Sequence, residues 1–498
     1  MNGPALGIVD DKPVELPPRY LTRHGLIAGS TGSGKSRTMQ VIAEQLADNG
    51  TYVFVSDVKG DASGFCVEGN QHERNELAPY KPHGIETNYW SLSDRFIPLR
   101  FSLDSVGSVL LSRLLSLNPT QESHLSLAFA YARKKEMQLR NFDDLLDVLD
   151  EMVEKKQRGI SQSSVNVIER KILAMQESGI DALFGKPSIT LGDLTGMNVL
   201  NLSDSRKNML VSIAPAFLLQ LLFEKLPEVG DVDRPKYAIF FDEAHYLFKD
   251  SNKSLQDLMV TILKQIRSKG VSIFFVTQDV TDLPDDILSQ LSTKIIFSQK
   301  VFTQKGNKRL KALAASFPKS KIDVMDEMKR LSPGVAVVST LNEKGNQTEP
   351  KKVRMFAPAT TMEVVDDETL LEASDPKLVE KYSRKEKKIA KKKSQEKIIP
   401  KPQPVQEKRQ EKKPEPRRKS GPPFYEGLFR FLLKLIDFIL KAGGKIIKAV
   451  VIKPLKSLFK YLTKKPVRII YLLLFFLVLY VIYVNWDAVQ SFLEMLKL

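Results

Sequence analysis

The sequence has very little cysteine and no recognisable secretory leader. Its single cysteine, Cys66, rules out a disulfide within the chain and favours a reducing compartment. The first residues lack a basic segment followed by an apolar run, so we expect no signal peptide. We also find no internal repeat of fixed period, which would mark a repeat architecture.

Positive charge is concentrated in the C-terminal part of the chain. The 498 residues have a formal net charge of +16. Residues 377–468 contain 29 Lys and Arg against 8 Asp and Glu, whereas residues 1–376 have a net charge of −4. The basic isoelectric point therefore gives no argument that the N-terminal body binds nucleic acid.

Residues 23–360 alternate short apolar runs with longer helical patterns, which is typical of a mainly parallel sheet covered by helices. The pattern is mostly helical between about 103 and 182, and we interpret this stretch as an insertion in the ATPase domain. We favour a role in packing and oligomer contacts over a catalytic role. Strands are expected at 25–28, 51–57, 198–203, 237–242 and 272–277, and towards one edge of the sheet at 294–298, 335–340 and 352–356.

One motif has a direct chemical interpretation. Residues 29–36 read GSTGSGKS, match GxxxxGK[ST], and lie between an expected strand and an expected helix. Its glycines allow backbone N–H groups to point at a phosphate, and the helix adds the positive end of its dipole. Lys35 would reach the β- and γ-phosphates of ATP, and Ser36 would ligate Mg²⁺. The predicted nucleotide-binding residues are Gly29, Ser30, Thr31, Gly32, Ser33, Gly34, Lys35 and Ser36.

Two later strands carry the groups that hydrolysis needs. The stretch YAIFFDEAH delivers Asp242, expected to hold Mg²⁺ through water, and Glu243, expected to polarise the attacking water. The strand SIFFVTQ ends in Gln278, expected to contact the γ-phosphate or that water. The plain alternative for Gln278 is a polar group in a loop. Together these motifs predict an ATP hydrolase.

Several longer stretches resemble the HerA-like ATPases of the HerA/FtsK superfamily, in particular the compact branch typified by YjgR. The resemblance covers about residues 1–360 and implies an α/β, RecA-like P-loop core. It also implies a homo-oligomeric ring, usually a hexamer, with ATP at subunit interfaces, and a motor that pumps or unwinds DNA. The N-terminal β-barrel of HerA is expected to be absent. The stretches are RHGLIAGSTGSGKS, VSDVKGD, PKYAIFFDEAHYLF, IRSKGVSIFFVTQDVTDLPDDILSQL and TLNEKG.

The resemblance also suggests residues that act between subunits or on DNA. Arg23 matches an arginine that precedes the P-loop strand and serves intersubunit sensing, and Arg354 is a second candidate; either could be a plain surface charge. The motif at 57–61, DVKGD, has no assigned role. Two basic clusters could line a DNA pore or be solvated helix faces: Lys264, Arg267 and Lys269, and Lys308, Arg309 and Lys311.

Beyond the ATPase domain, expected at 1–375, the composition changes. A Lys-, Pro- and Gln-rich stretch predicts a disordered linker that binds lipid, binds nucleic acid or acts as a spacer. Sixteen apolar residues at 469–484 predict a membrane span, with a buried or coiled-coil helix as the alternative. The preceding lysines place the ATPase domain in the cytoplasm. The expected segments are a linker at 376–423, amphipathic membrane-surface helices at 424–466, a transmembrane helix at 467–486 and a tail at 487–498.

Two functions follow as hypotheses. The first is a membrane-anchored, ring-forming ATPase that couples ATP hydrolysis to DNA translocation. The second is a membrane-tethered NTPase switch or scaffold that acts on an unidentified protein effector without moving DNA.

Overall fold

The computed structural model describes residues 3–204, 208–249, 252–280, 283–299 and 304–383. The description below concerns these residues, all of which belong to the first of the two units of the chain, Met1–Lys392. The expected amphipathic helices, transmembrane helix and tail, and the linker beyond residue 383, lie outside the described residues. Within the described residues, none of the helices combines the length and the apolar character that a membrane crossing needs.

The described residues form a 12-stranded sheet in the order β2-β1-β12-β11-β10-β3-β9-β8-β4-β7-β5-β6. The part from β10 to β6 is parallel, and β11, β12, β1 and β2 join it by antiparallel pairing. The strands are β1 Ala5–Val9, β2 Lys12–Glu15, β3 Gly25–Ala28, β4 Tyr52–Asp57, β5 Thr87–Ser91, β6 Ile97–Pro98, β7 Met197–Asn201, β8 Tyr237–Phe241, β9 Val271–Thr277, β10 Thr293–Ile296, β11 Val335–Ser339 and β12 Lys351–Met355.

The sequence-based strands are confirmed to within a few residues, and β10, β11 and β12 lie towards one edge of the sheet as expected. β12 is not the outermost strand, because β1 of the β1–β2 hairpin pairs with it on its outer side. The strands β1, β2, β5 and β6 were not expected. The hairpin therefore adds two strands beyond the stretch that carries Arg354.

Both faces of the central sheet are buried, which is why its strands are almost continuously apolar. Successive residues point to opposite faces: Phe240 and Phe274 stack at 5.0 Å on the side of α1, whereas Phe241 and Phe275 belong to the core on the other side. The helices α1 (Lys35–Asp48), α6 (Asn208–Lys225) and α8 (Lys253–Gln265) contribute to these two cores. The short helices are α7 Tyr246–Lys249, α9 Asp285–Leu288, α10 Gln304–Ala315, α11 Val324–Arg330 and α12 Asp367–Glu372.

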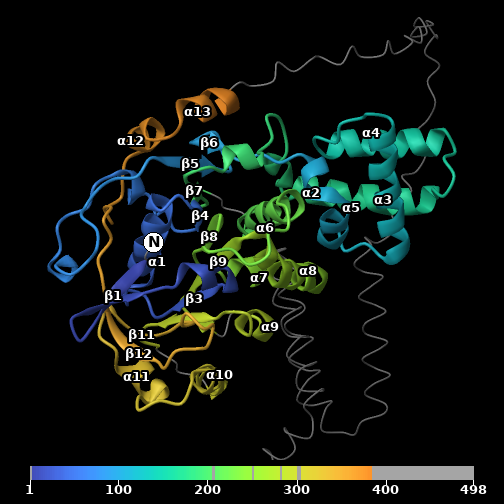
Figure 1. Cartoon of the computed structure of the whole chain (residues 1–498). Coiled ribbons are helices and arrows are strands. Elements are labelled where there is room, and N and C mark those ends of the chain that lie inside the picture. Colours follow the sequence, from blue (N-terminus) through green and yellow to red (C-terminus); the bar gives the residue numbers. More distant parts are fainter. Residues whose placement is uncertain (1–2, 205–207, 250–251, 281–282, 300–303, 384–498) are drawn as a thin grey trace, which may run out of the picture. The chain divides into compact units, whose positions relative to one another are not determined.

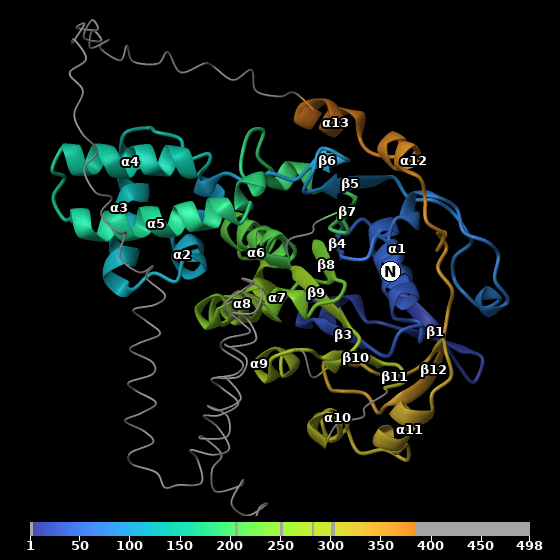
Figure 2. The same ribbon diagram turned by 180° about the vertical axis from the view of Figure 1, so that it is seen from behind.

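The expected insertion is helical, and it forms a bundle beside the sheet (Figures 1 and 2). Its amphipathic helix α4 buries Phe142, Leu145 and Met152 on one face, as the period of the sequence predicts. The bundle packs on the body through contacts of α2 with α6 and α8. Its helices are α2 Leu103–Leu114, α3 Pro119–Lys134, α4 Phe142–Glu154 and α5 Gln162–Glu177.

The folded body extends beyond the expected start of the linker. Residues 376–383, expected to be disordered, form helix α13 (Pro376–Ser383). Leu378 and Tyr382 of this helix are buried, and the Tyr382 ring meets Trp90 edge-on at 5.3 Å. A few apolar residues are therefore sufficient to dock this Lys-rich segment.

Candidate functional site

The loop between β3 and α1 has the geometry of a phosphate cradle. Gly32 and Gly34 adopt φ values of 74° and 120°, which glycine tolerates better than other residues. At Gly29 an added Cβ would lie 2.5 Å from Cβ of Phe297 and 2.6 Å from Oγ of Ser33, so the loop can pass this closely only as glycine. Lys35, 6% exposed, begins α1 and donates from Nζ to the Ser30 carbonyl oxygen at 3.2 Å. The cation is therefore held inside the loop.

A polar network crosses the tips of four neighbouring strands, β3, β9, β8 and β4. Thr31 Oγ1 of the loop donates to Gln278 Oε1 at 2.8 Å, and Gln278 Nε2 donates to Glu243 Oε1 at 2.5 Å. Lys59, which follows β4, forms an ion pair with the same Glu243 oxygen. The structure thus brings Gln278 and Glu243 into contact and adds Lys59 to them.

Glu243 is held ionised in a strained position. The residue is 2% exposed and adopts φ 48°, which is uncommon outside glycine and costs conformational free energy. Burial alone would raise its pKa, but hydrogen bonds from His245, Lys59 and Gln278 outweigh burial and lower the pKa to about 2. A permanently charged acceptor at this position suits a group that orients and polarises water.

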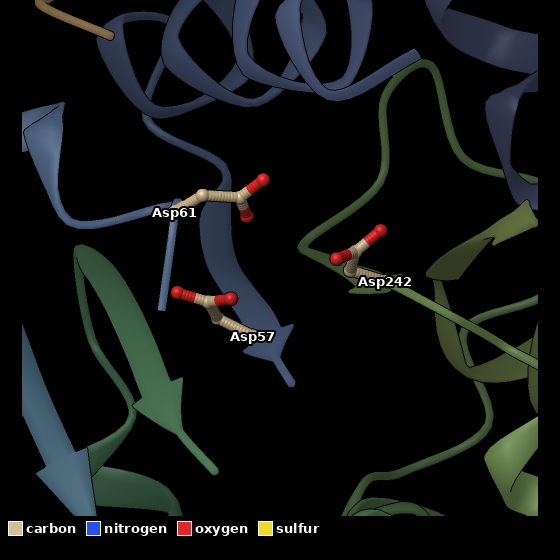
Figure 3. A group of neighbouring side chains, drawn as sticks. All are labelled: Asp57, Asp61 and Asp242. Atoms are coloured by element: carbon tan, nitrogen blue, oxygen red, sulfur yellow. The ribbon is translucent and has the colours of Figure 1, made fainter. Parts of the chain in front are cut away.

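Three carboxylates meet beside this network (Figure 3). Oxygen atoms of Asp57, Asp61 and Asp242 lie within 4.8 Å of one another. The oxygens of Asp57 accept backbone N–H groups of Lys59, Gly60 and Ala62 at 2.7–3.1 Å, so Asp57 shapes its own loop.

One carboxylate oxygen of Asp242, Oδ2, is buried and accepts no hydrogen bond from the described residues. Burial raises the pKa of Asp242 to about 7. A buried carboxylate oxygen without a donor, beside Asp61, fits a divalent cation, which favours oxygen ligands. This is the position expected for Mg²⁺.

The cradle opens into a cavity of about 360 Å³. Arg74 closes one side: its Nη2 lies 3.5 Å from the Pro333 carbonyl oxygen, and a Cβ added to Gly334 would lie 1.8 Å from its Nη1. Other lining residues are Gly32, Gly34, Lys35, Ser36, Lys59, Asp61, Met355 and Phe356. Sequence reasoning did not identify Lys59, Asp61 or Arg74 as site residues, although Lys59 and Asp61 belong to the unexplained DVKGD motif.

The two arginine candidates lie on different strands. Arg23 directly precedes β3, so it lies at the amino end of that strand, whereas the P-loop follows its carboxyl end. Arg23 is half-buried, with its guanidinium 5.3 Å from the centre of the Tyr20 ring. Arg354 is exposed on β12, next to Met355 of the cavity wall. Arg23 therefore cannot reach the nucleotide site of its own subunit.

The basic cluster near β9 is largely engaged within the chain. Lys269 donates to the Leu226 carbonyl oxygen at 2.7 Å and pairs with Glu228 at 3.2 Å, so it is not free to bind DNA. Arg267 donates to Asp231 Oδ1 at 2.8 Å. This hydrogen bond is the main cause that lowers the pKa of Asp231, and the charges of Arg19 and Arg23 add to it. Lys264 is exposed.

A phosphate loop, a buried acid pair and a polar network on adjacent parallel strands define a P-loop NTPase. The model of the helicase HerA-like C-terminal family matches residues 7–448. The chain therefore belongs to the HerA-like family, and it is an ATP-hydrolysing enzyme.

The chain has low sequence identity to individual proteins, but the aligned regions are long. The DNA double-strand break repair helicase HerA of Sulfurisphaera tokodaii is 25% identical over 400 residues, 77% of this chain and 72% of that protein. The HerA of Sulfolobus acidocaldarius is 22% identical over 394 residues, 73% and 69% of the two chains. Similar solved structures include VirB4 of Thermoanaerobacter pseudethanolicus (13% identity, TM-score 0.48, 71% and 96% covered) and the plasmid coupling protein TrwB with an ATP analogue (14%, 0.49, 72% and 92%).

Proposed function

We propose that the protein is a membrane-anchored, ring-forming ATPase that couples ATP hydrolysis to DNA translocation. The observation that carries the proposal is the network from Thr31 through Gln278 to Glu243 at the mouth of the phosphate cradle. It joins the group placed for water activation to the loop placed for the phosphates. Family membership and the HerA relatives, which are named as DNA repair helicases, support DNA as the substrate.

The residues divide the chemistry among them. Lys35 and the loop N–H groups bind the phosphates, and Gln278 and Glu243 orient the attacking water. Ser36, Asp242 and Asp61 are the residues that would hold Mg²⁺. The bound ion would neutralise charge that develops on the phosphates during transfer.

Assembly is proposed to complete the site. Arg23 lies at the amino end of β3, opposite the P-loop, so it can act only on a neighbouring subunit. In a head-to-tail contact, the amino end of β3 in one subunit would lie against the nucleotide site of the next subunit. Repeated contacts of this kind form a closed ring if the rotation between subunits divides a full turn. A hexamer is the ring that the family resemblance implies.

The membrane anchor is proposed from sequence alone. The apolar run at 469–484 and the basic stretch before it support a single C-terminal span with the ATPase domain in the cytoplasm.

The deciding experiment measures ATP turnover of the full-length protein in detergent, with and without DNA. We expect DNA to stimulate turnover and ATP to drive displacement of a third strand from a DNA triplex. Glu243→Gln, which should still bind nucleotide, is the matched control and should displace nothing. Equal turnover with and without DNA, and no displacement, would contradict DNA translocation.

The alternative is a membrane-tethered switch or scaffold that acts on a protein effector. The net charge of −4 on residues 1–376 favours it, because an acidic body attracts DNA weakly. On this alternative, ATP hydrolysis persists but does not respond to DNA.

A further inference from the structure

Lys59 lies where the catalytic carboxylate and the phosphate cradle meet. Its Nζ forms an ion pair with Glu243 Oε1, and its side chain, 38% exposed, lines the same cavity as Lys35. The roles given above to the P-loop and to Glu243 do not require this lysine. Its position therefore needs an explanation of its own.

The backbone of Lys59 is fixed, whereas its side chain has room to move. Asp57, which is fully buried, accepts the N–H groups of Lys59, Gly60 and Ala62 and so closes the loop after β4. Asp57 thus places the Cα of Lys59 at a defined point beside the cavity. A long, half-exposed ammonium on a rigid base can exchange one anionic partner for another at little cost.

The cavity holds two ammonium groups at its phosphate end. Lys35 Nζ lies within the loop, where it donates to the Ser30 carbonyl oxygen, and Lys59 Nζ lies at Glu243. Both side chains line the same cavity. An incoming polyphosphate would therefore meet two cations, one on each side of the tips of β9 and β8.

We propose that Lys59 binds the γ-phosphate of ATP and makes the site distinguish ATP from ADP; the inference rests on the proposed ATPase function. Lys35 belongs to the loop, whereas Lys59 is paired with the carboxylate that faces the attacking water, so Lys59 lies on the side of the terminal phosphate. ADP offers no group there. When Lys59 turns to the phosphate, Glu243 Oε1 retains Gln278 and can accept a hydrogen bond from water.

The test compares dissociation constants of ADP and of a non-hydrolysable ATP analogue, both with Mg²⁺, on the full-length protein in detergent. Lys59→Met should weaken analogue binding by about 10–100-fold, as expected for one lost charge-assisted hydrogen bond, and change ADP binding less than about twofold. Lys59→Arg keeps the charge and should keep most of the preference for the analogue. Lys253→Met removes an exposed lysine of α8 and is the matched control.

Two outcomes would overturn the inference. If Lys59→Met weakens both nucleotides equally, Lys59 only supports the architecture of the site. If neither affinity changes, Lys59 is merely the counterion of Glu243. Retained ADP binding shows that a variant is folded. If Lys59→Met does not fold, Lys59→Gln is used for the same test. The assay contains no DNA, so failure of DNA stimulation does not affect it, whereas a wild-type protein that binds neither nucleotide would contradict both proposals.

Discussion

The docking of α13 can be tested by removing one ring. Tyr382 is 1% exposed, its hydroxyl lies 3.1 Å from Asp193 Oδ2, and its ring packs against Trp90. Lys381 of the same turn donates to Asp193 Oδ1 at 2.6 Å. Tyr382→Ala deletes a buried aromatic side chain, whereas Tyr382→Phe deletes one hydrogen bond, so the pair separates packing from polar contact.

The expected magnitudes differ clearly. Loss of a buried aromatic side chain costs about 3–5 kcal/mol, and loss of one hydrogen bond about 1 kcal/mol. Helix α13 can detach from the body, so the destabilisation by Tyr382→Ala cannot exceed the free energy with which α13 docks. If proteolysis follows the population of the undocked helix, a difference of ~3 kcal/mol raises the cleavage rate about 100-fold and ~1 kcal/mol about fivefold.

The assay is limited trypsin digestion of the full-length protein, with mass spectrometry to follow cleavage after Lys381. Tyr382→Ala should be cut there far faster than wild type, and Tyr382→Phe only several-fold faster. Cleavage rates at other sites of the body serve as internal controls. Equal cleavage rates after Lys381 in wild type and Tyr382→Ala would refute the packing argument. The linker would then begin at residue 376, as the sequence predicts.

Four further predictions concern chemistry, assembly, pH and the tail. Lys35→Ala should abolish ATP binding in equilibrium titrations, whereas Glu243→Gln should bind ATP yet stop hydrolysis; near-normal turnover of Glu243→Gln would move the base elsewhere. Arg23→Ala should bind ATP but hydrolyse it slowly, and mixing it with Lys35→Ala should restore some turnover; a protein that stays monomeric with ATP would exclude this. Burial raises the pKa of Glu44 from 4.5 to about 7, so its contribution to stability is full below 4.5 and lost as the pH rises through 7. In urea titrations the free energy of unfolding of wild type should therefore fall between pH 5 and pH 8, and that of Glu44→Gln should fall by up to about 3 kcal/mol less. The same pH dependence in both proteins would contradict the raised pKa of Glu44. Full-length protein should stay in membranes after a high-salt wash, because salt screens lysines but not the apolar run at 469–484; release by salt alone would argue against a span.

Local patterns in the sequence were sufficient to predict the central strands and to propose the main groups of the nucleotide site. The phosphate loop is one uninterrupted motif, and Asp242 and Glu243 are adjacent, so no tertiary information is needed to recognise them. The strands that carry them are apolar on both faces, which produces a strong signal. The helical insertion was equally readable, because α4 repeats its apolar residues with the period of a helix.

Other elements carry too weak a local signal. β2 reads KPVE and is largely exposed, and β5 reads TNYWS, so neither shows the apolar run of a buried strand. α13 is part of a Lys-rich stretch, and only its tertiary contacts distinguish it from a linker. For β5 and α13 the stabilising partners, β7 and Trp90, are far away in the sequence, whereas β2 pairs with the neighbouring β1 and is missed because it is short and polar.

The sequence by itself determined which residues could bind and hydrolyse ATP, because these residue types stand in short, continuous motifs. The tertiary structure alone decided which of them act together. Strand order places β8 between β9 and β4, and this order brings Gln278 and Lys59 to the same oxygen of Glu243. This result depends on long-range strand pairing, and no local pattern of residues encodes which strands become neighbours.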